Sequence, residues 1–105
     1  MVITDTVSRL DYGHTRITLE PHGEIDAGSV DELATMVHDA LRAGAHELDV
    51  DLRQVTFMDT AALAVLEQAR EVLAASGGFL CLRNPLPPVR RLLRLTALCP
   101  GPRDG

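Results

Sequence analysis

A carboxylate and a hydroxyl stand side by side, as Asp59-Thr60, in an otherwise apolar run, VTFMDTAALAVL (residues 55–66). Asp is a good helix cap, because its carboxylate accepts hydrogen bonds from the first backbone N–H groups and favours the positive end of the helix dipole. Thr60 is β-branched, and the small residues that follow it leave its hydroxyl unshielded. The pair is therefore interpreted as a helix cap, a site, or both.

A hydroxyl group acts as a nucleophile only with a base within reach and a group that stabilises the developing negative charge. The histidines lie in predicted turns or near helix ends, without the HxxH or HExxH spacing of a zinc site; they are His14, His22, His38 and His46. The chain also lacks the GxxxxGKS/T and GxGxxG sequences that cradle phosphates. We therefore expect no catalytic residue, no metal and no cofactor. A nucleotide hydrolase that uses Asp26, Asp59 and Thr60 is the weakest interpretation.

The first part of the chain predicts a β-hairpin. Residues 2–10 and 15–20 are β-branched and roughly alternating, with the turn sequence DYGH between them. Pro21 and Gly23 are expected to end the second strand, so that residues 24–26 form a short extension or a loop.

The rest of the chain alternates helices with strands. Ser29 is expected to cap a helix that begins at Val30, with Glu32 at its third position and Gly44 at its end. The remaining predicted elements are a strand at 47–52, a helix at about 60–75 that ends at Gly77-Gly78, a strand at 79–82 and a last helix at 89–98.

The strand at 47–52, ELDVDL, indicates how the sheet is covered. Its leucines and valine point one way, and Asp49 and Asp51 point the other way. A strand buried on both faces would be continuously apolar. The later alternation of strands and helices predicts right-handed βαβ crossovers. The expected fold class is α/β, a mixed β-sheet of four to five strands with helices packed mainly on one face.

The same topology suggests a site at the carboxyl ends of the strands, where α/β proteins usually bind ligands and partners. If the strands before Asp26 and Asp59 are parallel neighbours, both carboxylates lie near the Thr60 hydroxyl. Residues 61–66 are apolar on every side of the helix predicted at about 60–75. The start of this helix is therefore either buried or presented to a partner protein.

Composition excludes several classes of function. The chain has 105 residues, 46% of them apolar, which predicts one domain with its own core. A net charge of −5 and 3% aromatic residues argue against direct nucleic-acid binding. The cluster Arg90-Arg91 with Arg94 is interpreted as the solvated face of a helix. No long apolar run or signal-peptide pattern occurs, so no membrane insertion and a cytoplasmic location are expected.

Two cysteines fit this compartment without a disulfide. Cys81 lies in the apolar run FLCL and is expected to be buried, whereas Cys99 lies near the end of the chain. The sequence PGPRDG is expected to be a flexible tail, so that the domain spans residues 1–99 and the tail residues 100–105.

Three stretches together resemble the STAS domain, and within it the stand-alone anti-sigma factor antagonists of bacteria. GEID (23–26) is similar to the family's Gly-Glu-Leu/Ile-Asp after the second strand. DLRQVTFMDTAAL (51–63) is similar to its signature Asp-Leu-x-x-Val-x-Phe-Met-Asp-Ser-Ser/Thr-Gly-Leu. LRNPLPPVRRLLRLTAL (82–98) is similar to its closing turn and last helix. The resemblance covers nearly the whole chain.

The resemblance implies a partner switch. In such proteins the residue after the motif Asp, here Thr60, is phosphorylated by an anti-sigma factor that is also a Ser/Thr kinase of the histidine-kinase-like ATPase type. The unphosphorylated antagonist binds this kinase and the phosphorylated form is released, until a phosphatase resets it. The implied partner-binding residues are Asp26, Asp59, Thr60, Ala61, Ala62 and Leu63. The implied role is that of a regulator and substrate, not an enzyme.

Two departures from the signature keep a second function open. Thr60 replaces the family Ser, and Ala62 replaces the family Gly, whose lack of a side chain allows close backbone approach. STAS domains also serve in phospholipid-transport ATPase complexes, and one such subunit carries a motif threonine. In that alternative, Thr60 would be an interface contact with the ATPase. Neither the oligomeric state nor the identity of the sigma factor follows from the sequence.

Overall fold

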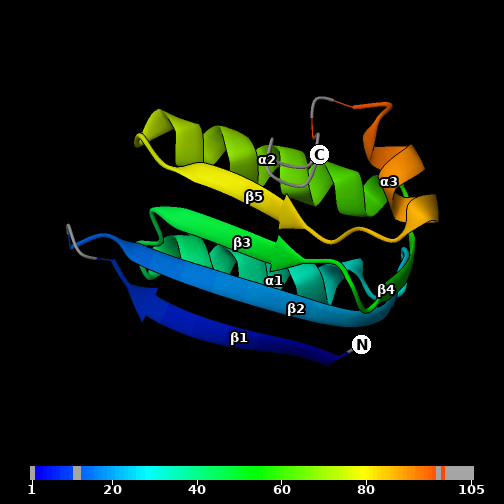
Figure 1. The fold of residues 1–105 in the computed structure, drawn as a ribbon, viewed down its shortest axis with the longest axis horizontal. Helices are drawn as coiled ribbons and strands as arrows, with labels where there is room; N and C mark the ends of the chain where they lie inside the picture. Colours follow the sequence, from blue (N-terminus) through cyan, green and yellow to red (C-terminus); the bar gives the residue numbers. More distant parts are fainter. Residues whose placement is uncertain (1, 11–12, 97, 99–105) are drawn as a thin grey trace.

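A computed structural model describes residues 2–10, 13–96 and 98 of the chain. The elements, in chain order, are β1 (Val2–Arg9), β2 (Thr15–Ile25), α1 (Val30–Arg42), β3 (Glu47–Asp51), β4 (Val55–Met58), α2 (Thr60–Ala75), β5 (Phe79–Arg83) and α3 (Pro87–Leu93). Figure 1 shows α1 and α2 along the sheet and α3 at one end of the molecule. The tail predicted at residues 100–105 and Cys99 lie outside the described residues.

The five strands form one mixed sheet, as the sequence predicted, although β4 was not among the strands whose bounds were predicted. The strand order is β1-β2-β3-β5, and β4 pairs with β2 beyond the end of β3. Only the β1–β2 pairing is antiparallel among the described strand pairs, and β2–β3, β2–β4 and β3–β5 are parallel. The fold class is therefore α/β with a five-stranded sheet and three helices in the described residues.

The core lies between the sheet and helices α1 and α2. Leu48 and Val50 of β3 are fully buried on the helix side, as the alternation of this strand predicted. Leu33 of α1 and Leu66 of α2 are also fully buried. One apolar stripe on each helix thus covers one face of the sheet, which is the arrangement that stabilises an α/β layer.

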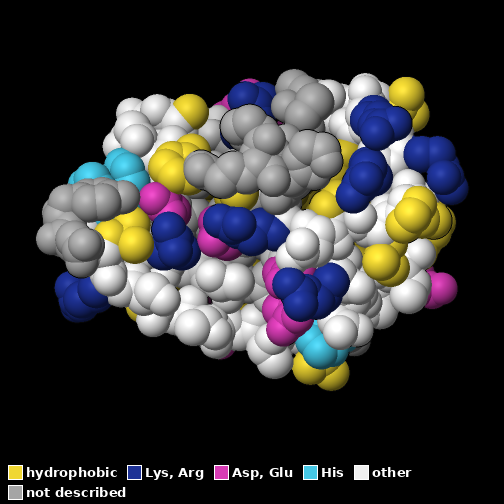
Figure 2. Space-filling view, in the orientation of Figure 1, with side chains coloured by type: hydrophobic (Ala, Val, Ile, Leu, Met, Phe, Trp, Pro, Cys, Tyr) yellow, Lys and Arg dark blue, Asp and Glu magenta, His cyan; other side chains and the backbone are white. Residues whose placement is uncertain are grey.

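The opposite face of the sheet carries ion pairs, although Glu47 and Asp49 on it are only 6% and 4% exposed. Arg16 Nε donates to Glu47 Oε2 over 2.7 Å, and Arg83 Nε donates to Asp49 Oδ2 over 3.1 Å. These arginines come from the strands on either side of β3. Figure 2 shows basic and acidic side chains next to one another on this face. The arginine side chains thus shield carboxylates that no helix covers.

The expectation that Pro21 and Gly23 end the second strand is wrong. Strand β2 continues to Ile25, because its pairing with β3 stops at Leu19 and its pairing with β4 starts at Gly23. Pro21 lies in the interval between the two ladders, where a missing N–H is tolerated. Gly23 has φ +100 at the register shift, a backbone conformation that glycine adopts readily.

Ser29 does not cap α1 with its side chain, contrary to the prediction. Its hydroxyl donates to the Glu24 carbonyl over 2.8 Å and accepts from the Asp26 N–H over 3.1 Å. Ser29 therefore closes the turn between β2 and α1. Its hydroxyl oxygen bonds to this turn and not to the backbone N–H groups of the first turn of α1.

The last helix is shorter than the predicted range 89–98. It begins at Pro87, a residue well suited to a first helical turn, and ends at Leu93. The Thr96 hydroxyl donates to the Leu93 carbonyl and accepts from the Leu98 N–H, each over 2.9 Å, which turns the chain out of the helix. Cys81, expected to be buried, is half-buried in β5.

Candidate functional site

Two parallel strands end side by side at the candidate site. Ile25 of β2 is in register with Met58 of β4, and the Asp59 N–H donates to the Ile25 carbonyl over 3.2 Å. Asp26 and Asp59 each follow one of these paired residues. The two strands are thus parallel neighbours, which is the condition under which the sequence placed both carboxylates at the same end of the sheet.

Asp59 is the N-cap of α2. Its Oδ1 accepts hydrogen bonds from the Ala61 N–H over 3.0 Å and from the Ala62 N–H over 3.3 Å. The carboxylate thereby satisfies two backbone donors that the first turn leaves without a partner, and it places negative charge at the positive end of the helix. The cap also fixes the direction in which the first helical residue, Thr60, leaves the sheet.

Asp26 is held in a tight turn that leads from β2 into α1. Its Oδ1 accepts from the Gly28 N–H over 2.9 Å, and its carbonyl accepts from the Ser29 and Val30 N–H groups over 3.0 and 2.8 Å. A Cβ atom at Gly28 would lie 3.3 Å from the Asp26 carboxylate, which would have to shift by a few tenths of an ångström to admit it. Asp26 is half-buried and its position is determined by backbone contacts.

Thr60 is exposed at the first position of α2, and Ala61 beside it is half-buried. Ala62 and Leu63 face the core, where they are 0% and 5% exposed. Among the predicted partner-binding residues, only Asp26, Asp59, Thr60 and Ala61 therefore present side chains to solvent.

Two exposed apolar residues lie close to this pair in the sequence, and sequence reasoning singled out neither by itself, although Ala64 belongs to the apolar run 61–66. Phe57 of β4, two residues before Asp59, is 48% exposed, and Ala64 of α2 is exposed one turn after Thr60. Alternation could not have predicted that Phe57 is exposed, because the middle two residues of β4 are both exposed. The only sequence signal for this position was the aromatic residue itself. We call Phe57, Thr60, Ala61 and Ala64 the Thr60 surface.

The Thr60 surface combines an exposed hydroxyl with exposed apolar side chains. Three hollows on the described surface are lined by other residues. Within the described part of the chain, no group of three or more His, Cys, Asp or Glu side chains is placed to hold a metal ion. No helix in that part is both long and apolar enough to cross a bilayer. An exposed hydroxyl on a partly apolar surface can receive a modification and can contact a protein.

The sequence matches the STAS domain over residues 8–101, most of the chain. The chain belongs to the STAS domain family. Its fold is similar to that of an anti-sigma factor antagonist from Mycobacterium paratuberculosis, which is 28% identical, with a TM-score of 0.68 over 92% of this chain and 80% of that one. TM1081 of Thermotoga maritima, described as a candidate anti-sigma factor antagonist, is 26% identical, with a TM-score of 0.75 over 89% and 78%.

The fold is also that of SpoIIAA, a Bacillus anti-sigma factor antagonist. The unphosphorylated form of SpoIIAA is 19% identical, with a TM-score of 0.74 over 90% of this chain and 82% of SpoIIAA. SpoIIAA also has a structure in its phosphorylated form, with a TM-score of 0.69. No curated protein matches the sequence.

Proposed function

We propose that this STAS domain protein is an anti-sigma factor antagonist that switches partners through phosphorylation of Thr60. The observation that carries the proposal is the exposed Thr60 hydroxyl at the start of α2, directly after the Asp59 cap. The similarity in fold to solved anti-sigma factor antagonists supports the same role. Unphosphorylated protein would bind the anti-sigma factor and thereby release the sigma factor.

The Asp59 cap explains why a phosphate on Thr60 would disrupt an interface. A phosphate adds roughly −1.5 to −2 charges and three acceptor oxygens. The Ala61 and Ala62 N–H groups that could receive it already donate to Asp59 Oδ1. The phosphate would therefore remain on the surface, repelled by the Asp59 and Asp26 carboxylates, and a partner docked there would have to desolvate it.

The same geometry favours release without refolding. Helix α2 keeps its cap in either state, and its buried face, which includes Leu63 and Leu66, points away from the modification. In this proposal the ATP and its metal belong to a partner kinase of the histidine-kinase-like type, and a phosphatase resets the switch. The protein is a substrate and regulator in the cytoplasm, not an enzyme.

The test uses the chain as bait in extract of its own host, with wild type, Thr60→Ala, Thr60→Glu and Thr6→Glu compared. Thr6 is exposed on β1, so that Thr6→Glu adds the same charge away from the Thr60 surface. We expect wild type, Thr60→Ala and Thr6→Glu to capture a kinase-type anti-sigma factor. Thr60→Glu should bind the purified kinase at least about tenfold more weakly than wild type does, which is a loss of about 1.4 kcal/mol in binding free energy.

Two results would reject the switch. Equal affinity of Thr60→Ala and Thr60→Glu for the kinase would mean that charge at this position does not control binding. Capture of a lipid-transport ATPase by all four baits would instead support the alternative, in which this protein is a STAS subunit of a phospholipid-transport complex and Thr60 is an interface contact. Incubation of the purified pair with ATP, followed by mass spectrometry, then tests Thr60 as the phosphorylated residue.

A further inference from the structure

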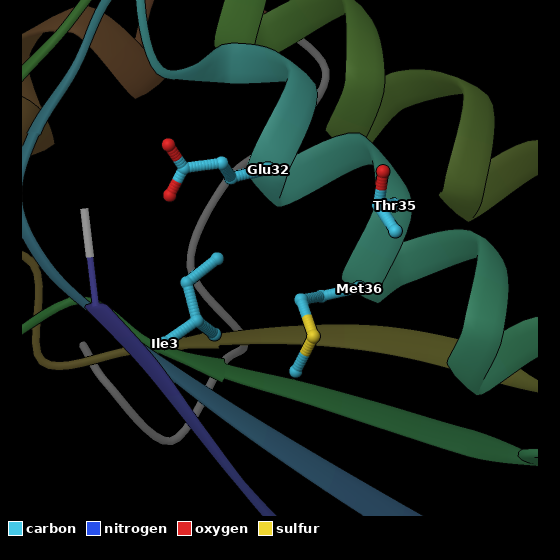
Figure 3. A pocket seen from close by; sticks show the side chains of 4 residues that line it. All are labelled: Ile3, Glu32, Thr35 and Met36. Carbon is cyan, nitrogen blue, oxygen red and sulfur yellow. The ribbon is translucent and has the colours of Figure 1, made fainter.

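A groove between β1 and α1 shares no lining residue with the Thr60 surface. Figure 3 shows one hollow of it, about 320 Å³, with Ile3 on β1 facing Glu32, Thr35 and Met36 on α1. A second hollow of about 240 Å³ shares Met36 with the first and continues along the same two elements. Its lining residues are Asp5, Val7, Ile17, Leu19, Met36, Asp39, Ala40 and Ala43. We call the two hollows together the β1–α1 groove.

The groove exists because β1 extends beyond the helix layer. Helix α1 packs on β2, while β1 forms the edge of the sheet and lies apart from the helices (Figure 1). Asp5 and Val7 are in register with Leu19 and Ile17 of β2, so they face the same side as these buried residues. Val7 is nevertheless 62% exposed. An apolar side chain on the core side of the sheet is thus left without a cover among the described residues.

The chemistry of the groove indicates what it would accept. Its floor is apolar, with Leu19 and Ala40 buried at 1% and 4% exposure. Its rim carries the carboxylates of Asp5, Glu32 and Asp39, and no described residue that lines it is basic. An apolar floor with an acidic rim is complementary to an apolar surface flanked by Lys or Arg.

The shape of the groove favours a macromolecule over a small ligand. The groove is elongated, because it runs along α1 from Glu32 to Ala43 and divides into hollows of about 320 and 240 Å³ that share Met36. The two hollows follow one another beside α1, which suits successive side chains from one face of a helix. A helix laid there would extend the layer that α1 and α2 already form. A second copy of this chain fits less well, because copies with a net charge of −5 repel one another.

We propose that the β1–α1 groove docks an amphipathic helix of a partner protein, with an apolar face and basic flanks. This interaction goes beyond the Thr60 switch, because it uses β1 and α1 and does not require phosphorylation. Its affinity should fall with added salt, since the charges on the rim are solvent-exposed.

The absence of lysine from the sequence makes a sharp test available. The probe is a helical peptide of about 15 residues, with a leucine stripe flanked by lysines, since shorter isolated helices are marginal in water. A matched peptide carries glutamates in place of the lysines. A carbodiimide joins amines directly to carboxylates, so that the lysine peptide reports which carboxylates of the full chain it touches. Mass spectrometry identifies the joined residues, and fluorescence anisotropy measures affinity.

We expect the lysine peptide to be joined to Asp5 and Asp39. Asp31 and Glu71 are exposed carboxylates that do not line the groove, and they should remain unmodified. The lysine peptide should bind at least about tenfold more tightly than the glutamate peptide, which is about 1.4 kcal/mol.

Matched surface variants locate the binding. Val7→Arg should reduce binding of the lysine peptide at least about tenfold. Val72→Arg, at a position 49% exposed on α2, should leave it unchanged. Thermal unfolding of both variants confirms that they remain folded, which the exposure of both positions leads us to expect.

Four outcomes would overturn the proposal. They are equal affinity of the two peptides, binding that Val7→Arg leaves unchanged, cross-links on Asp31 or Glu71, and a concentration-dependent dimer that Val7→Arg abolishes. The last would mean that the groove pairs two copies of the chain. None of these results bears on Thr60, so that this proposal and the proposed switch can fail separately.

Discussion

At the scale of single residues, Asp59 and Thr60 divide two tasks that the sequence places side by side. Asp59 binds the backbone of the first turn of α2, and Thr60 presents its hydroxyl to solvent. The sequence left open whether the pair is a cap or a site. The geometry assigns the cap to Asp59, and the function proposed for Thr60 depends on that cap, because Asp59 occupies the N–H groups that a phosphate could otherwise accept from.

The cap makes a quantitative prediction. Asp59→Ala should lower the free energy of unfolding by about 1 kcal/mol, because the Ala61 and Ala62 N–H groups lose their acceptor. Asp59→Asn should lose less, since Asn also caps helices well. Thr60→Ala is the matched control and should change stability little, because Thr60 is exposed. Urea unfolding measures the free energy of unfolding of all three variants. An Asp59→Ala protein with the same free energy of unfolding as wild type would contradict the role of the cap.

At the scale of elements, local patterns predicted most of the fold. The bounds of α2 followed from Asp59 before it and Gly77 after it, and β3 followed from its alternation. The passage of β2 through Pro21 could not be predicted, because it depends on where β3 and β4 pair with β2. The burial of Asp49 likewise depends on arginines supplied by other strands.

The ion pairs on the open face of the sheet predict unequal effects of similar mutations. Arg83→Met should lower the free energy of unfolding by about 2 kcal/mol, because it removes the partner that lies 3.1 Å from the buried Asp49 carboxylate. Arg16, at 3.8 Å, would remain near this charge and moderate the loss. Arg53→Met should cost less than about 1 kcal/mol, because Arg53 is 57% exposed in its pair with Asp51.

Urea unfolding of the two variants in parallel makes this comparison direct. Both substitutions remove one guanidinium and keep a long apolar side chain, so that the difference between them reports the burial of the acidic partner. Equal losses would mean that Asp49 gains no more from its arginine than the more exposed Asp51 does.

At the scale of the whole molecule, the fold separates two surfaces of different chemistry. The Thr60 surface is built by β4 and the start of α2, whereas the β1–α1 groove lies along the edge strand and α1. Basic side chains gather at the end of the molecule where α3 lies, and this helix carries Arg90 and Arg91 (Figure 2). The sequence patterns pointed to the Asp59-Thr60 pair within the first surface, but not to Phe57. They did not predict the groove, because it arises from how far β1 extends beyond α1.

This separation predicts that the two surfaces act independently, given the proposed function and the proposed groove. Thr60→Glu should leave the affinity of the lysine peptide unchanged, and Val7→Arg should leave the affinity for the kinase unchanged. In the double variant, each ligand should lose the same affinity as with its own single substitution, within about 0.5 kcal/mol, as expected for sites without shared partners. Anisotropy and kinase binding measured on all four proteins complete the cycle. A coupling above about 1 kcal/mol would contradict independence and point to α1, which begins just after Asp26 and lines the groove with Glu32.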